Sequence, residues 1–107
     1  MYFLALIPLG TWAHHGAAPY DRSQSVTVRG TVTQFRFMNP HVLIYAAVED
    51  LEGEVVEWSG ELTSPNRLAR GEASAKWNRN IIQPGDIIEL TGNPASNGAP
   101  SLRLLKV

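Results

Sequence analysis

Apolar and polar positions alternate with a period of two over residues 25–37, the pattern of a strand with one face in a core. The apolar or small residues of its first part lie at even positions: Val26, Val28, Gly30 and Val32. Beyond Gln34 the apolar positions are Phe35 and Phe37, so the phase changes from even to odd. One inserted residue produces this change, and the sequence therefore predicts a β-bulge near Thr33 and Gln34 in a bent strand.

Two further strands are predicted to follow as a hairpin. Residues 41–48 come after a turn at residues 39–40 and are apolar on both faces, as in a strand buried on two sides. A tight turn over residues 50–53 leads to residues 56–62, where apolar and polar positions alternate again. Trp58 is in phase with the apolar positions of this strand, so we expect it in the core.

One helix and two strands complete the expected order. Serine is a favoured N-cap and proline fits the first helical position, so Ser64–Pro65 predicts a helix that runs from Pro65 to about Arg70. Residues 87–92 and 101–107 are the last predicted strands. A long bent strand followed by β-β-α-β-β is the order of an OB-fold, a five-stranded Greek-key barrel. The expected class is therefore all-β with one short helix, with an SH3-like barrel or a small sandwich as the alternative.

Composition narrows the classes of function. The chain has 107 residues, of which 44% are hydrophobic and 18% charged, as in a single globular domain. Nine basic and ten acidic residues give a formal net charge of −1, which lacks the basic field of a nucleic-acid-binding protein. The absence of cysteine excludes disulfides, thiol nucleophiles and iron–sulfur clusters.

The first residues are predicted to be a signal peptide remnant, covering residues 1–13. The apolar run Met1–Leu9 is shorter than the ~20 residues of a membrane-spanning helix, but it has the length of a signal-peptide core. Thr11-Trp12-Ala13 is an acceptable cleavage site, although no basic segment precedes the run. Cleavage would leave His14 as the N-terminus of an exported, periplasmic protein without a membrane span. Residues 14–24 then form an extended lead, and residues 25–107 form the barrel domain. The alternative is that the apolar run is a first strand or a buried tail.

A set of short motifs runs through most of the chain: Ala13-His14-His15-Gly16, Tyr20-Asp21, residues 26–33, Asn39-Pro40-His41-Val42, Trp58-Ser59-Gly60-Glu61, residues 64–68, Pro84-Gly85-Asp86 and Gly92-Asn93-Pro94-Ala95. This set resembles a family of short exported bacterial proteins that is catalogued only as a domain of unknown function. Members of that family begin the mature chain with His-His and carry Asn-Pro-His after the first strand. The resemblance covers Ala13 to about Leu105. It implies export and a small β-barrel, and it implies no activity.

The three histidines, His14, His15 and His41, are the candidate metal ligands, with Glu61 as a further candidate. Imidazole is the commonest protein ligand of zinc and copper, and nitrogen-rich sites suit Cu(II). At a mature N-terminus His14 can chelate through its amine and its ring, or His15 through amine, backbone amide and ring, and His41 can add a nitrogen. The alternative is a polar terminus and a His41 that bonds a nearby backbone carbonyl.

Whether His41 meets the N-terminus depends on the path of the lead. The first strand is about 40 Å long at ~3.3 Å per residue, with His41 beyond its far end. The lead, residues 15–24, extends to about 30 Å. A lead that doubles back along the strand can bring the histidines together, but nothing in the sequence requires this path. A site made by His14 and His15 alone, or one shared between subunits, is equally allowed.

Three hypotheses for the function follow from these residues. The first is an exported binding domain for copper or zinc. The second is a non-catalytic module of the cell envelope that binds a protein partner or a second copy through barrel faces and the edge of the short last strand. Phe35, Phe37 and Tyr45 are candidates for an exposed stacking surface in such a module. The third is a mononuclear copper enzyme, which only the His14 start suggests, since no nucleophile motif or catalytic carboxylate pair is present.

Overall fold

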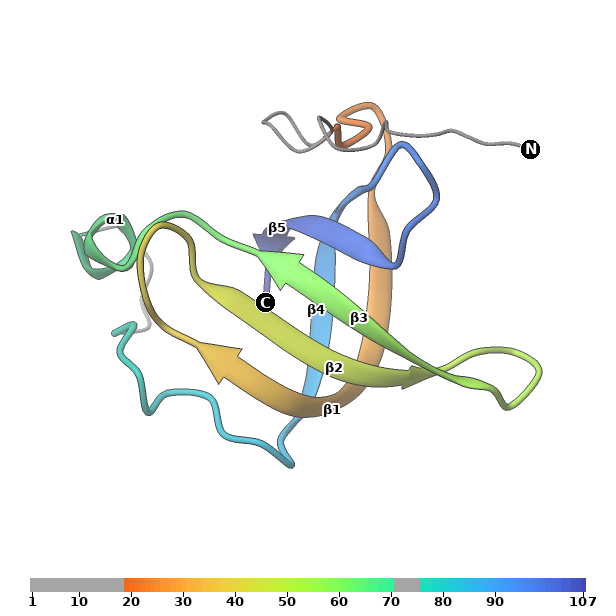
Figure 1. Ribbon diagram of the computed structural model, residues 1–107, viewed down its shortest axis with the longest axis horizontal. Helices are drawn as coiled ribbons and strands as arrows, with labels where there is room; N and C mark the ends of the chain where they lie inside the picture. The colour runs from red at the N-terminus through yellow and green to blue at the C-terminus, as the bar shows by residue number, and fades with distance from the viewer. Residues whose placement is uncertain (1–18, 71–75) are drawn as a thin grey trace, which may run out of the picture.

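Five strands and one short helix form the described part of the chain, residues 19–70 and 76–107, in this computed structural model (Figure 1). In chain order the elements are β1 (Val26–Arg36), β2 (Leu43–Glu49), β3 (Val55–Glu61), α1 (Pro65–Arg70), β4 (Ile87–Pro94) and β5 (Ser101–Lys106). The predicted leader and the histidines His14 and His15 lie outside the described residues. Within the described ranges, no helix is long and apolar enough to cross a membrane.

The strands close into a barrel in the order β1-β2-β3-β5-β4, and β4 pairs back with β1. All pairs are antiparallel except β3 with β5, which run parallel. This arrangement confirms the predicted all-β class with one short helix and a five-stranded barrel, and a sandwich is excluded because the sheet is closed.

The predicted β-bulge lies in the middle of β1. Val32 pairs with Ala46 and Gln34 pairs with Tyr45, so Thr33 is the extra residue in this strand. The bend lets one strand serve two neighbours, since Val26–Thr31 pairs with β4 and Thr31–Arg36 pairs with β2. Figure 1 shows β1 turning from the direction of β4 to that of β2.

Two glycines allow strands to approach closely where the barrel curves. A Cβ atom at Gly30 would overlap the carbonyl oxygen of Ala47, and one at Gly92 would overlap the carbonyl oxygen of Arg103. Both positions therefore exclude any residue with a side chain unless the neighbouring backbone moves.

The core fills the inside of the barrel. Its buried residues are Val32, Ile44, Ala46, Ile82, Leu90, Leu102 and Leu104. Trp58 packs against this cluster, as predicted from its phase. Phe35 also packs against it, and Phe37 and Tyr45 are half-buried, so none of the three aromatic residues considered above is fully exposed.

The burial of β2 differs from the prediction, which expected both faces of this strand to be buried. Val42, Ile44, Ala46 and Val48 are buried, whereas Leu43, Tyr45 and Ala47 are only half-buried. A single closed sheet has one interior, and within residues 19–70 and 76–107 no second layer covers the outside of the strand.

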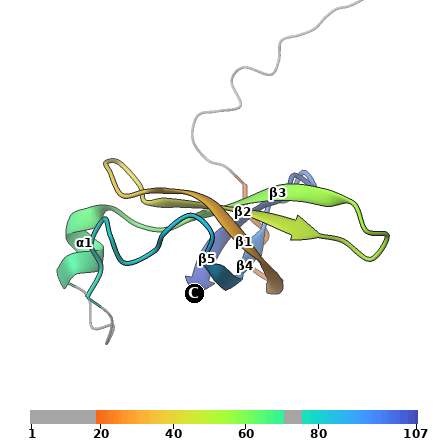
Figure 2. The same cartoon turned by 90° about the horizontal axis from the view of Figure 1, so that it is seen from below.

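The helix begins as predicted. The Ser64 hydroxyl accepts a hydrogen bond from the backbone N–H of Arg67 at 3.3 Å, and Arg67 and Arg70 are exposed. In both views α1 lies at one end of the barrel, and the β2–β3 hairpin projects from the other end (Figures 1 and 2).

Candidate functional site

The backbone brings His41 to the end of β3. His41 lies in the connection between β1 and β2, and Glu61 is the last residue of β3. The neighbouring Val42 donates its N–H to the Thr63 carbonyl at 3.0 Å and accepts the Leu62 N–H at 2.8 Å. The β1–β2 connection is therefore fixed beside the carboxyl end of β3.

One carboxylate oxygen of Glu61 bonds His41. Nδ1 of His41 lies 2.7 Å from Oε2 of Glu61, and the two side chains are 52% and 29% exposed. An ionised carboxylate only accepts hydrogen bonds, so the proton of this contact is on Nδ1. In the neutral imidazole the lone pair is then on Nε2. The contact fixes both the tautomer and the orientation of the ring.

The other carboxylate oxygen of Glu61 accepts a hydrogen bond from Tyr20. The Tyr20 hydroxyl donates to Oε1 at 2.9 Å and lies 3.3 Å from the Ser101 hydroxyl, which in turn accepts from the Ser59 hydroxyl at 3.2 Å. Both oxygens of Glu61 thus have partners. The sequence predicted no role for Tyr20, and its only signal was the place of Tyr20-Asp21 among the family motifs.

The lead reaches this site by continuing the antiparallel pairing of β1 with β4, after a turn over residues 21–24. Tyr20 forms an isolated bridge with Ala95, and Asp21 donates its N–H to the Pro94 carbonyl at 2.8 Å. The Asp21 carboxylate closes the following turn by accepting from Ser23 and Gln24, as expected of a turn residue. These hydrogen bonds, those of Ser23 first, lower the pKa of Asp21.

The surroundings of Tyr20 keep its hydroxyl protonated. Burial is the largest effect and raises the pKa of Tyr20 above 10.0; the hydrogen bond with Ser101 lowers it, and the hydrogen bond and charge of Glu61 raise it. At neutral pH the hydroxyl is therefore a donor to Glu61.

The structure tests only part of the predicted ligand set. It brings His41 and Glu61 together and leaves His14 and His15 outside the described ranges. Among residues 19–70 and 76–107, no group of three or more histidine, aspartate or glutamate side chains is placed to hold a metal ion. Glu57, four positions before Glu61, accepts a hydrogen bond from the Thr33 hydroxyl at 2.7 Å instead of joining the site.

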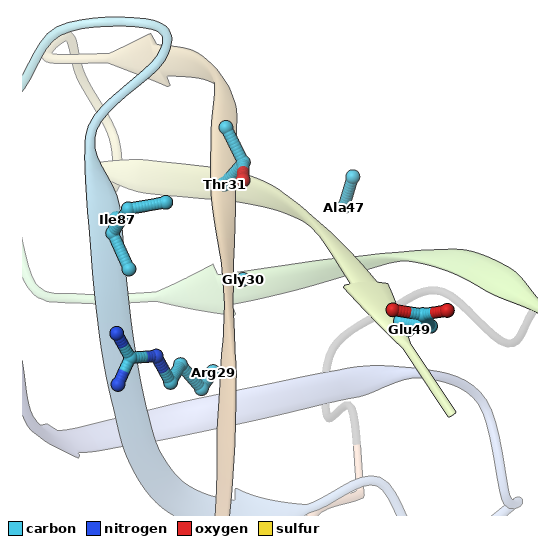
Figure 3. A pocket seen from close by; sticks show the side chains of 6 residues that line it. All are labelled: Arg29, Gly30, Thr31, Ala47, Glu49 and Ile87. Atoms are coloured by element: carbon cyan, nitrogen blue, oxygen red, sulfur yellow. The ribbon is translucent and has the colours of Figure 1, made fainter. Parts of the chain in front are cut away.

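A separate shallow depression of about 370 Å³ lies on the outside of β1, β2 and β4 (Figure 3). Its lining residues are Arg29, Gly30, Thr31, Ala47, Glu49 and Ile87. The depression is open to solvent and offers one cation, one carboxylate and no histidine. The His41–Glu61–Tyr20 cluster is therefore the better candidate for a functional site.

Comparison with known proteins places the chain in a family. The sequence model of a family described as a family of unknown function (DUF6152) matches residues 4–102. The match begins inside the apolar run of residues 1–9 and covers Tyr20, His41 and Glu61. Among curated proteins, no sequence matches this chain.

Proposed function

The chain belongs to the DUF6152 family, and we propose that it is an exported small β-barrel domain that binds a transition metal ion, copper or zinc, through His41, His14 and His15. The proposal gives each residue of the candidate site a separate task. His41 is a ligand, Glu61 orients it, and Tyr20 holds Glu61 and the N-terminal lead in place.

The contact between His41 and Glu61 carries this proposal. Metal-ligating histidines almost always donate their second ring N–H to a carboxylate, a carbonyl or water. Nδ1 of His41 is occupied in this way at 2.7 Å, which supports Nε2 as the atom that would bind the metal in this proposal. Because both oxygens of Glu61 have partners, its role in the proposed site is orientation and not ligation.

The position of Tyr20 supports a contribution from the N-terminal histidines. Tyr20 bonds the same carboxylate as His41 and follows His15 by five residues. Five extended residues span at most about 18 Å, so the chain is long enough for His14 and His15 to reach His41. With the amine of a mature His14, the set supplies the three or four nitrogens that Cu(II) or Zn(II) requires.

Export is supported by the leader and by the family. An apolar run followed by Ala13 precedes the first histidine, and the family match extends to residue 4. The proposal expects cleavage after Ala13, because cleavage creates the amine ligand at His14.

The competing explanation is a surface ion pair without a ligand. Exposed pairs of this kind contribute ~0–1 kcal/mol to stability and require no metal. The two explanations differ in what happens at Nε2 of His41, so they are separated by titration with metal.

The test is calorimetric titration of the processed protein, beginning at His14, with Cu(II) and with Zn(II). We expect about one tightly bound ion, with affinity reduced at least about 100-fold in His41→Ala and about 10- to 100-fold in Glu61→Gln. Glu89→Gln removes an exposed carboxylate of β4 outside this cluster and is the matched control. Equal affinity in His41→Ala and the unsubstituted protein would refute the proposed site. Mass spectrometry of the protein recovered from the periplasm tests cleavage separately.

A further inference from the structure

The pairing between β3 and β5 covers less than half of β3. All seven residues of β3 pair with β2, but only Ser59, Gly60 and Glu61 pair with β5. Within the described part of the chain, residues 55–58 therefore have a strand partner on one side alone. Figure 1 shows this half of β3 continuing into the projecting hairpin, beyond the start of β5.

The orientation of the backbone identifies the unpaired groups. Ser59 donates its N–H to the Pro100 carbonyl at 3.1 Å, on the side of β3 that faces β5. Backbone groups of alternate residues point to the same side of a strand. The backbone N–H and C=O groups of Val55 and Glu57 thus point outward along the edge. An added strand could form hydrogen bonds with all four of these groups.

The hairpin that carries this edge is strongly acidic. Six of the ten acidic residues of the chain lie on it, and all but Glu61 are exposed: Glu49, Asp50, Glu52, Glu54 and Glu57. No lysine or arginine occurs between Arg36 and Arg67. The apolar side chains of Val55 and Leu51 are also exposed, at 66% and 105% of their reference areas.

We propose that the open edge of β3 accepts an extended, positively charged segment of a partner protein as an added strand. Backbone hydrogen bonds give such an addition its affinity, and side chains at alternate positions give it specificity. On one face the added strand lies beside Glu57, where a lysine or arginine complements the charge. On the other face it lies beside Val56 and Trp58, where an apolar residue fits. The segment therefore alternates between basic and apolar residues.

Charge also selects between a partner and a second copy of the chain. Two copies joined through the same edge would bring their acidic hairpins side by side, and like charges on neighbouring strands are destabilising. Charged residues on an exposed edge prevent such self-pairing in many β proteins. The edge is thus suited to a cationic strand and unsuited to itself.

This surface is separate from the proposed metal site. Val55 and Glu61 are at opposite ends of β3, about 20 Å apart at the usual rise per residue. Either proposal can fail without affecting the other, because no residue of the edge takes part in the His41–Glu61–Tyr20 cluster.

The test uses the full chain and two synthetic peptides, acetyl-(Lys-Val)4-amide and acetyl-(Glu-Val)4-amide. Nuclear magnetic resonance follows the amide signals during titration, together with their exchange in D2O. We expect the Lys-Val peptide to bind, to shift the signals of residues 55–58 and to slow exchange at Val55 and Glu57 at least tenfold. Shifts confined to another part of the barrel, or equal binding of the Glu-Val peptide, would overturn the proposal.

Two substitutions separate backbone pairing from charge. Val55→Pro removes an outward-facing N–H that has no partner in the barrel, so the fold is expected to tolerate it. Glu57→Lys reverses the charge beside the added strand. Each is expected to weaken peptide binding at least tenfold, whereas Glu89→Lys, on the exposed part of β4, leaves it within twofold.

Two further results would refute binding of a cationic strand at this edge. Unchanged affinity in both Val55→Pro and Glu57→Lys would exclude the edge as the binding surface. Concentration-dependent dimers in analytical ultracentrifugation, lost in Val55→Pro, would make a second copy the occupant and refute the cationic partner.

Discussion

At the scale of single residues, Tyr20 joins parts of the chain that are far apart in sequence. Its hydroxyl contacts Glu61 at the end of β3 and Ser101 at the start of β5, while its backbone pairs with Ala95. Sequence patterns did not predict this role, because a tyrosine in a polar lead has no periodic neighbours that indicate its burial. His41 and Glu61 were recognised as candidates by residue type, but their contact depends on the β1–β2 connection crossing the end of β3.

Tyr20 is expected to make the stability of the protein fall at alkaline pH. Burial raises its pKa above 10.0 in the folded protein, so the folded state holds this proton more tightly than the unfolded state. Its contribution to the free energy of unfolding is complete below pH 10 and is lost as the pH rises through the raised pKa. Tyr20→Phe should lower the free energy of unfolding at pH 7 by about 1 kcal/mol. Between pH 7 and pH 11, the free energy of unfolding of this variant should fall less than that of the unsubstituted protein. Urea unfolding from pH 7 to 11 measures both effects, and parallel pH curves for the two proteins would contradict the assignment.

At the scale of the elements, local signals were sufficient for most of the chain. The change of phase at Gln34 predicted the bulge at Thr33, and Ser64–Pro65 predicted the start of α1. The parallel pairing of β3 with β5 had no such signal, since it joins segments about forty residues apart. The last strand was expected to offer a free edge, but β5 lies between two partners. It pairs with β4 between Leu102 and Lys106 and with β3 from Ser101 to Arg103.

The β2–β3 hairpin should depend on one carboxylate. Asp50 accepts the backbone N–H groups of Glu52 and Glu54, both at 2.9 Å, and so closes the turn. Asp50→Ala is expected to destabilise the protein by about 1–2 kcal/mol, and Asp50→Asn by less, because an amide oxygen can still accept. Glu52→Ala, an exposed acid of the same turn, is the control and should change stability by less than ~0.5 kcal/mol. Thermal unfolding of the three variants measures the difference, and equal losses for Asp50→Ala and Glu52→Ala would exclude the proposed role.

At the scale of the whole molecule, one small core supports every strand. The barrel class was predictable from the order of the elements, because three meandering strands, a helix and two strands have few ways to close. Alternation predicted the side that β1 and β3 turn inward, but it could not do so for β2, where residues on both faces are apolar. Composition and pattern did not predict the open edge of β3, because its location depends on how far β5 extends along β3.

Two leucines of β5, one buried and one exposed, test which residues form the core. Leu102 is completely buried between β3 and β4, whereas Leu105 is 57% exposed on the same strand. Leu102→Ala should destabilise the barrel by about 2–5 kcal/mol, and Leu105→Ala by less than ~1 kcal/mol. Urea unfolding gives both values, and an unchanged slope with denaturant would show that the two-state transition is retained. A larger loss for Leu105→Ala would mean that the core is assigned to the wrong face of β5.

The bend in β1 also has a consequence for the time in which the barrel forms. Its second half meets β2 across a short connection, so this hairpin can assemble early from local contacts. Its first half meets β4, and Val26 cannot find Gly92 until nearly the whole barrel sequence has been synthesised or collapsed. Proteins dominated by such distant pairings fold in about milliseconds to seconds, far more slowly than helical bundles. We therefore expect β1 to contain a part that orders early, beyond Thr31, and a part before Thr31 whose ordering completes the fold.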